Sequence, residues 1–357
     1  MMVVVVHERY YLRGTTWEPF AESAMRAGGM GVDLFFLISG FIMAHTTGGV
    51  GGGGVAAARF VVRRFARIWP VYAILMLIAI PQIHGLAYFS DQWRSIAMAM
   101  LFLPLDASQL PYLGTPYPLG WTLNYEMYFY LLLGACLLLD RWRWLALAAW
   151  FAAVTIAIPV WAGSFSLDTR QGHGWSAFAE QVSNPIALDF LTGVLIGLFH
   201  RNFRPLISGR LRGGLSLVAL GTTGFAIFWN LHDNTLFHGL AGWGWPLALM
   251  LFALSAADRA MTIPTPLPVV WLGQISYSLY LSHPITLRAC NRAMSYFGIE
   301  AYTHTWVYIA MTMALAIFFA WISWRMLECW LSNRLRDRAL SLLDRFVSAP
   351  AQRRSTC

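Results

Sequence analysis

Four ionisable side chains lie inside or at the edge of strongly apolar segments. His7 ends the run MMVVVVH, Asp33 lies in GVDLFFLISGF, Glu126 in PLGWTLNYEMYFYLLLGACLLL, and His283 in ISYSLYLSHP. A charged side chain at the centre of a bilayer costs about 3 kcal/mol on insertion scales, so such residues are functional candidates. A histidine beside a carboxylate can act as a base, because the carboxylate fixes the tautomer and stabilises the imidazolium that forms.

Three of these residues also have an ordinary structural explanation. Asp33 can cap a helix, His283 can be a hydrogen-bonded packing histidine, and Glu126 can be half of a structural ion pair. All four are nevertheless expected in the middle or outer half of the membrane. This coincidence favours a reactive site in which His7 is the base or nucleophile and Glu126 or Asp33 orients it.

Three arginines open another apolar segment, VVRRFARIWPVY. Spacings of three and four residues place Arg64 and Arg67, or Arg63 and Arg67, on one face of a helix. The guanidinium fork suits phosphate better than a point charge does. Anchoring of the helix at the cytoplasmic surface explains the same arginines equally well.

The composition is that of an integral membrane protein. Of the 357 residues, 58% are hydrophobic and 12% charged, whereas soluble domains carry about a quarter charged residues. All 25 basic residues are arginines, and they fall in a few short connections rather than on one basic face, so nucleic acid binding is not expected. The four cysteines lack metal-ligand spacing, so neither a disulfide framework nor a metal site is expected.

The elements that must position the candidate residues are nine apolar runs, preceded by a shorter run at the start of the chain. Each of the nine runs can cross a hydrocarbon core of about 30 Å as a helix. They lie near residues 30–47, 68–83, 119–139, 144–162, 186–199, 214–230, 244–257, 270–287 and 305–327. The arginine-rich connections alternate with arginine-poor ones, as the positive-inside rule requires. The pattern predicts an all-α bundle of about ten transmembrane helices with both termini in the cytoplasm.

One transmembrane domain is predicted over residues 1–335, followed by a cytoplasmic basic tail over 336–357. Residues 94–105, RSIAMAMLFLPL, spoil the alternation of loops if they count as a full crossing. We therefore expect a re-entrant or interfacial helix there.

Four segments resemble successive motifs of the membrane acyltransferase family 3. They are GVDLFFLISGFIM at 31–43, RRFARIWPVY at 63–72, GWTLNYEMYFY at 120–130 and ISYSLYLSHP at 275–284. They occur in order along nearly the whole chain, and the exopolysaccharide and O-antigen O-acetyltransferases are the most similar members. The resemblance implies an enzyme that moves an acetyl or other short acyl group from acyl-CoA, as co-substrate, to a hydroxyl of a cell-surface or exopolysaccharide glycan.

The resemblance also implies roles for individual residues. His7 matches the histidine at the end of the family's first helix, which implies a catalytic role. Arg64 and Arg67 match an R-x-x-R pair that holds the coenzyme, and Glu126 matches the glutamate of W-x-L-x-x-E. Side chains of the same motifs that are candidates for binding substrate are His283, Trp121 and Tyr280.

The first helix departs from the family pattern. In the family an arginine precedes the histidine and starts this helix, and that position would lie ahead of Met1. The first helix is therefore expected to be truncated, because of either a misassigned start codon or damage to the gene.

Two other classes of function are compatible with the sequence: a membrane transporter or flippase of glycan, and a non-catalytic partner of polysaccharide synthesis. The absence of inverted-repeat symmetry disfavours a transporter. For the enzyme we expect the bacterial inner membrane as location, a glycan acceptor and the lipid bilayer as partners, and contact with the polysaccharide synthesis machinery.

Overall fold

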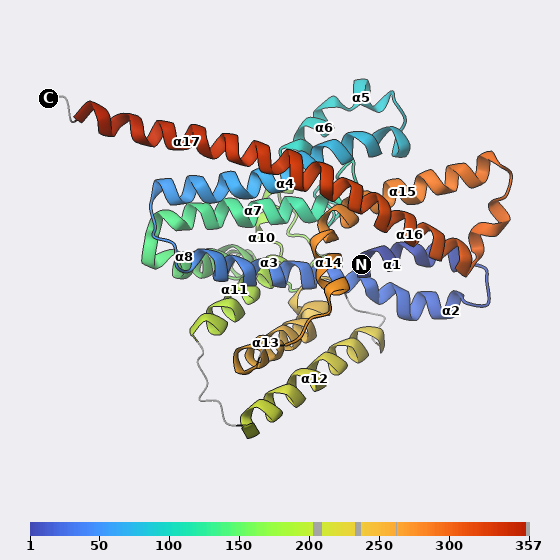
Figure 1. Ribbon diagram of the computed structural model, residues 1–357, viewed down its shortest axis with the longest axis horizontal. Coiled ribbons are helices and arrows are strands. Elements are labelled where there is room, and N and C mark those ends of the chain that lie inside the picture. The colour runs from blue at the N-terminus through green and yellow to red at the C-terminus, as the bar shows by residue number, and fades with distance from the viewer. Residues whose placement is uncertain (203–208, 233–236, 262, 355–357) are drawn as a thin grey trace.

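A computed structural model describes residues 1–202, 209–232, 237–261 and 263–354 of the chain, and these residues form helices and no strands (Figure 1). Within this part of the chain, seven helical stretches are long and apolar enough to cross a membrane. They are Glu18–Thr47, Gly54–Ile83, Gly120–Trp161, Ala177–Asn202, Gly213–His232, Leu240–Ala260 and Trp306–Val347. The chain is an all-α, multi-pass membrane protein, as the composition predicts, whereas the count of about ten spanning helices stays a prediction.

The helices follow one another as short and long elements. The longer ones are α3 (Gly31–Thr47), α4 (Gly54–Ile83), α7 (Gly120–Cys136), α11 (Ala187–Asn202), α12 (Gly209–His232), α13 (Trp245–Ala260), α15 (Ser276–Tyr296), α16 (Trp306–Ser323) and α17 (Asn333–Arg354). The shorter α-helices are α1 (Met2–Glu8), α2 (Glu18–Phe20), α5 (Tyr88–Asp91), α6 (Trp93–Met100), α8 (Arg143–Phe151), α9 (Ile158–Trp161), α10 (Ala177–Ser183) and α14 (Leu267–Gln274). The 3₁₀ and π turns are η1 (Arg9–Leu12), η2 (Ala21–Met25), η3 (Arg26–Met30), η4 (Leu137–Trp142), η5 (Ala152–Ala157), η6 (Leu240–Gly244), η7 (Glu300–His304) and η8 (Trp324–Ser332).

Helices α3 and α11 pack closely through glycines. A Cβ atom on Gly40 would overlap the carbonyl oxygen of Phe190, and one on Gly193 would overlap that of Leu37. Small residues let two helix backbones approach in this way. The facing residues advance together along both helices, so α3 and α11 run parallel and bring their first turns to the same end of the bundle.

The apolar runs 119–139 and 144–162 form a helical hairpin. The chain reverses at Asp140, which adopts a left-handed backbone with φ of 47°, and the Gly52 amide donates to its Oδ1 at 2.7 Å. On the way back Trp150 Nε1 donates to the Tyr128 hydroxyl at 2.6 Å. Two antiparallel helical segments therefore meet at Asp140, in agreement with the two separate apolar runs predicted from the sequence.

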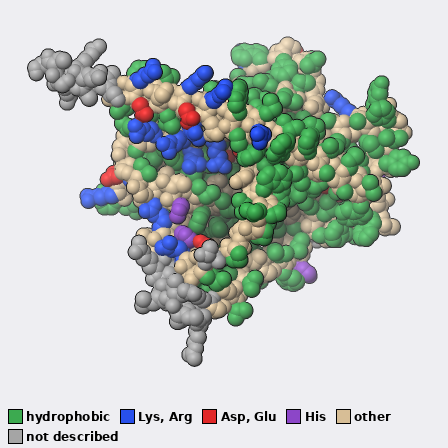
Figure 2. Space-filling model, viewed as in Figure 1, with side chains coloured by type: hydrophobic (Ala, Val, Ile, Leu, Met, Phe, Trp, Pro, Cys, Tyr) green, Lys and Arg blue, Asp and Glu red, His purple; other side chains and the backbone are tan. Residues whose placement is uncertain are grey.

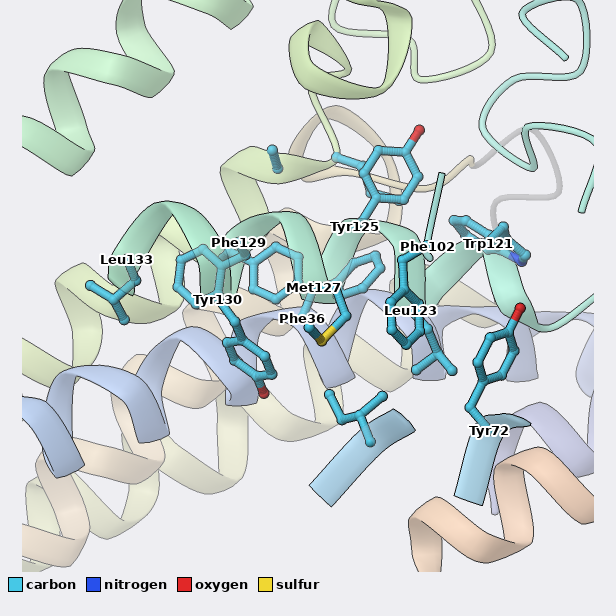
Figure 3. Packing of buried hydrophobic residues seen from close by; sticks show 14 of the residues in the cluster. Phe36, Tyr72, Phe102, Trp121, Leu123, Tyr125, Met127, Phe129, Tyr130 and Leu133 are labelled. Carbon is cyan, nitrogen blue, oxygen red and sulfur yellow. The ribbon is translucent and has the colours of Figure 1, made fainter. Parts of the chain in front are cut away.

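An aromatic cluster holds α7 in the centre of the bundle. Figure 3 shows the side chains of Trp121, Tyr125, Phe129 and Tyr130 following this helix. The Phe36 ring of α3 lies 6.4 Å from both the Trp121 and the Tyr125 rings, measured between centroids. Because α7 is covered on most sides, the polar residues that it carries are removed from lipid.

The segment 94–105 does not cross the membrane as a helix. Helix α6 has eight residues, which corresponds to about 12 Å, and the chain continues irregularly after it. Trp69 Nε1 of α4 donates to the Met100 carbonyl at 3.0 Å and holds α6 against the bundle. The prediction that this segment is no full crossing agrees with the structure, and its depth in the membrane stays a prediction.

The predicted boundary at 335/336 falls inside a helix. Helices α16, η8 and α17 form one continuous stretch, and α17 packs along α4 (Figure 1). Arg59 of α4 forms an ion pair with Asp344 at 2.7 Å. The described part of the predicted tail is therefore a helix docked on the bundle, and its cytoplasmic location stays a prediction.

Candidate active site

A glycine of η3 and the first glycine of α3 position the short helix α1, which carries His7. A Cβ atom on Gly28 would overlap the Met2 carbonyl, and one on Gly31 would lie 3.1 Å from Met2 Cβ. These glycines let α1 lie directly on the turn that precedes α3. In the structure α1 is only seven residues long.

His7 faces His283 across the interface of α1 and α15. The two ring centroids are 5.1 Å apart, and the Tyr280 ring lies 6.4 Å from that of His283. His283 is fully buried, with Nδ1 3.1 Å from the Leu279 carbonyl. Since a carbonyl only accepts, Nδ1 carries the proton, and Nε2 is an acceptor without a hydrogen-bond partner among the described residues. The structure thus brings together three residues that the motifs single out.

Glu8 is a buried carboxylate that the sequence analysis missed. It is fully buried, and Thr312 of α16 donates from Oγ1 towards both carboxylate oxygens at 3.0 and 3.1 Å. Glu8 therefore ties the end of α1 to α16. The signal was present in the sequence as an acidic residue next to His7, but it stands just past the end of the apolar run.

Asp33 pairs with a histidine other than the one expected. His238 Nδ1 lies 2.8 Å from Asp33 Oδ2, and the Gly239 amide donates to Oδ1 at 2.5 Å. The His238 ring lies between those of Trp121 and Trp243, at centroid distances of 5.3 and 4.9 Å. A carboxylate–histidine pair therefore exists at the end of the bundle where α3 begins, but its histidine comes from the loop that precedes η6 and α13.

A second buried carboxyl, also missed, lies beside Asp33. Asp189 opens α11, is fully buried, and has no hydrogen-bond donor for either oxygen among the described residues. Its carboxyl interacts with that of Asp33 because α3 and α11 begin at the same end. Its position did not mark it as a candidate, since an acidic residue in the first turn of a helix is common.

Glu126 is buried on α7 and hydrogen-bonds within its own helix. Tyr130 donates its hydroxyl to Oε1 at 2.6 Å, and Oε2 has no hydrogen-bond partner in the described part of the chain. Within the same residues, neither Glu126 nor Asp33 lies at ion-pair distance from His7. The predicted orienting contact with His7 is therefore not made here, and a catalytic role for either carboxylate stays a prediction.

Two cavities share a pair of arginines in their linings. The outer cavity, of about 560 Å³, lies between α4 and the stretch η8–α17, and Arg63, Arg64 and Arg67 line it. The inner cavity, of about 440 Å³, is lined by residues 1–4 and by parts of α3, α7 and α15. Arg64 and Arg67 line both. Figure 2 shows basic side chains gathered at this end of the molecule, below α17.

The inner cavity leads from these arginines towards the histidines. Its lining includes Glu126 and Thr122 of α7 and Tyr280 of α15. The Thr122 and Tyr280 hydroxyls are hydrogen-bonded at 2.9 Å, and Tyr280 lies beside His283. His7 itself lies one turn beyond Val4, the last residue of α1 in the lining.

The three arginines of α4 are available to an anion. None of Arg63, Arg64 and Arg67 forms an ion pair with a carboxylate among the described residues. The Arg64 guanidinium is flanked by the rings of Phe60 and Tyr130, 5.7 and 5.6 Å from their centroids. This stacking fixes Arg64 without neutralising its charge. The same part of the chain contains no group of three potential metal ligands.

A helical bundle in which His7 faces the buried His283 beyond a cavity lined by arginines has the features of a membrane-bound enzyme. Residues 1–325 match the family model described as an acyltransferase domain, and the chain belongs to this family. It is an acyltransferase that transfers groups other than amino-acyl groups.

Curated relatives agree with this assignment. The chain is 29% identical over 290 residues to the exopolysaccharide production protein ExoZ of Rhizobium meliloti (strain 1021), covering 77% of this chain and 81% of the relative. It is 26% identical to nodulation protein 10 of Rhizobium leguminosarum bv. viciae, covering 84% and 80%. It is also 26% identical to the acyltransferase MdmB of Streptomyces mycarofaciens, covering 78% and 73%. No solved structure matches the chain.

Proposed function

We propose that this acyltransferase moves an acetyl or other short acyl group from acyl-CoA to a hydroxyl of a cell-surface or exopolysaccharide glycan. The observation that carries the proposal is that Arg64 and Arg67 line both cavities. A donor with phosphates at one end and a thioester at the other fits an entrance lined by arginines that is followed by a largely apolar cavity. The bacterial inner membrane, with the arginine-rich end and both termini in the cytoplasm, is part of the same proposal.

The acyl end of the donor enters first, and the phosphates remain at the arginines of the entrance. Guanidinium groups bind phosphate oxygens through parallel hydrogen bonds. The pantetheine arm then lies in the inner cavity, where Ile38, Ile42 and Tyr277 contribute to the lining. This places the thioester on the side of the cavity formed by α1 and α15.

His7 carries the chemistry. As a base, its imidazole takes the proton from the acceptor hydroxyl; the oxygen attacks the thioester carbonyl, the C–S bond breaks, and the thiolate of coenzyme A leaves and is protonated by the imidazolium. As a nucleophile, a ring nitrogen of His7 attacks the thioester carbonyl, the C–S bond breaks and the thiolate of coenzyme A leaves; the acceptor hydroxyl then takes the acyl group from the imidazole, and its proton goes to the thiolate. His283 supports either route, because its unprotonated Nε2 can accept a hydrogen bond from His7.

The name of ExoZ, an exopolysaccharide production protein, supports a glycan as acceptor. Trp121 and His238 lie together near the end of the bundle opposite the arginines. An indole ring and an imidazole are suited to stacking on a sugar and binding its hydroxyl groups. The acceptor would then approach His7 from the side opposite the donor.

Release of coenzyme A by the purified protein tests the proposal. We expect the full chain in detergent to release free thiol from acetyl-CoA when envelope glycan is added. His7→Gln should slow the release by about 10²-fold or more, which is the usual contribution of a general base. His232→Gln, on an exposed end of α12, is the matched control and should keep the wild-type rate. Full activity of His7→Gln contradicts the role of His7, and glycan movement without thiol release identifies a transporter.

A further inference from the structure

The outer cavity has a second wall that no motif of the family covers. Besides α4, it is lined by Glu328 and Ser332 of η8 and by Asn333, Arg336 and Asp337 of α17. This wall lies beyond residue 325, where the family match ends.

We propose that α17 completes the donor site, with Arg336 and Arg63 binding the 3'-phosphate of coenzyme A while Arg64 and Arg67 bind its diphosphate. The inference rests on the proposed function, since it assumes that acyl-CoA is the donor. It adds a binding residue from an element that the sequence analysis assigned to a tail.

The assignment of phosphates follows from which arginines line which cavity. Arg64 and Arg67 line both cavities, whereas Arg63 and Arg336 line only the outer one. In coenzyme A the diphosphate joins the pantetheine arm to the ribose that carries the 3'-phosphate. With the arm in the inner cavity, the diphosphate lies at the shared pair, and the 3'-phosphate can lie only in the outer cavity.

Two buried polar atoms in the outer cavity lack a partner. Ser332 is 4% exposed, and its hydroxyl has no hydrogen-bond partner among the described residues. The buried Nε of Arg64 also has no hydrogen-bond partner among the described residues. Buried donors without partners are rare, because each costs about 1–3 kcal/mol. Both groups line the cavity, where phosphate oxygens would satisfy them.

Contacts at both ends hold the second wall in place. Glu328 accepts from the Ser278 amide at 3.1 Å and from its hydroxyl at 2.5 Å, which ties η8 to α15. The Arg59–Asp344 ion pair ties the far part of α17 to α4. Glu328, Ser332 and Arg336 are spaced by four residues, so this stretch presents them on one face. The first part of this stretch, η8, is a π-helix, and π-helical turns occur frequently at functional sites.

The charge balance of the outer cavity favours an anion. Four arginines line it, against the carboxylates of Glu328 and Asp337. Asp337 lies 2.8 Å from Arg336 and is exposed, so a phosphate can replace it as the partner of the guanidinium. Removing this carboxylate should therefore strengthen phosphate binding rather than weaken it.

The test compares the affinity of the purified full chain for coenzyme A and for 3'-dephospho-coenzyme A by calorimetry. The wild type should bind coenzyme A at least about tenfold more tightly, a difference of 1.4 kcal/mol. Arg336→Ala should remove most of this preference without changing the affinity for the dephospho form, and Asp337→Asn should increase the preference. Arg64→Ala should weaken binding of both. Arg338→Ala, an exposed arginine of α17 outside the cavity lining, is the control and should change neither affinity.

Each other outcome has a definite meaning. The assignment of the 3'-phosphate is overturned if the wild type binds the two nucleotides with equal affinity. It is also overturned if Arg336→Ala lowers the affinity for both nucleotides by the same factor. In either case the acyl-CoA proposal stands. If Arg336→Ala does not fold, an unchanged or reduced preference in Asp337→Asn overturns it instead. Absence of binding for both nucleotides in the wild type overturns the donor proposal together with this inference.

Discussion

At the scale of residues, the ionisable side chains that the sequence singles out belong to two separate groups. His7 lies against His283, and Asp33 is hydrogen-bonded by His238. The sequence predicts one histidine–carboxylate pair, in which Glu126 or Asp33 orients His7. The actual partner could not be chosen, because His238 lies in a loop some two hundred residues away and nothing local links it to Asp33.

A double-mutant cycle distinguishes these pairings. Asp33→Asn removes the charge of Asp33 and one of its two acceptor oxygens, so Asp33→Asn and His238→Gln should show a coupling of about 0.5–3 kcal/mol in the free energy of unfolding. Asp33→Asn and His7→Gln should be additive within about 0.5 kcal/mol, since their side chains do not touch. Thermal melts of the four combinations of each pair provide the measurement. Strong coupling of Asp33 with His7 would restore the orienting role predicted from sequence.

The hydroxyl of Tyr130 gives a further prediction at this scale. It is the sole hydrogen-bond donor to Glu126 in the described residues, at 2.6 Å, so Tyr130→Phe leaves a buried carboxyl without a partner. The expected loss of stability is about 1–3 kcal/mol. Tyr302→Phe, which alters an exposed tyrosine, should be close to neutral. A melting temperature unchanged by Tyr130→Phe would show that this hydrogen bond does not stabilise the fold.

At the scale of elements, glycines decide where the helices that carry the site can lie. The apolar runs predict most of the helices, but hydropathy does not reveal that Gly40 and Gly193 set the distance between α3 and α11. It also does not reveal that η3 supports α1. These contacts join segments far apart in the sequence, and a glycine in an apolar run gives no sign of its partner.

Gly193→Val tests the close packing of α3 against α11. Added carbon atoms would overlap the Leu37 backbone, and overpacking of this kind costs about 1–3 kcal/mol. Gly221→Ala is the control on α12, where a Cβ atom meets nothing within 4 Å and alanine favours the helix. We expect a lower melting temperature for Gly193→Val and an unchanged or higher one for Gly221→Ala. The reverse order would mean that the two helices are not in close contact.

At the scale of the whole molecule, the fold class, the family and the outline of the spans follow from the sequence alone. Composition and the alternation of arginine-rich loops suffice for a multi-pass bundle, because hydrocarbon excludes irregular backbone. The two cavities that share Arg64 and Arg67 could not be predicted, since they depend on how α4, α7, α15 and α17 pack together. The docking of α17 on α4 was missed because its polar sequence resembles a free tail.

The proposed orientation makes a prediction that labelling can check. In a cysteine-free background, Ala301→Cys lies at the end of the bundle away from Arg63, Arg64 and Arg67, and Ser341→Cys lies at an exposed position of α17. A membrane-impermeant maleimide should label Ala301→Cys on intact cells, and Ser341→Cys only after the membrane is permeabilised. Labelling of Ser341→Cys on intact cells would invert the topology and place the arginines outside.

The central claim is that this chain transfers an acyl group from acyl-CoA through His7. Membranes containing the wild type, His7→Ala or His232→Ala would be incubated with acetyl-CoA labelled in the acetyl group, and label in the envelope glycan would be counted. The account predicts incorporation by the wild type and by His232→Ala, and a loss of about 10²-fold or more in His7→Ala. Equal incorporation by His7→Ala would contradict the account.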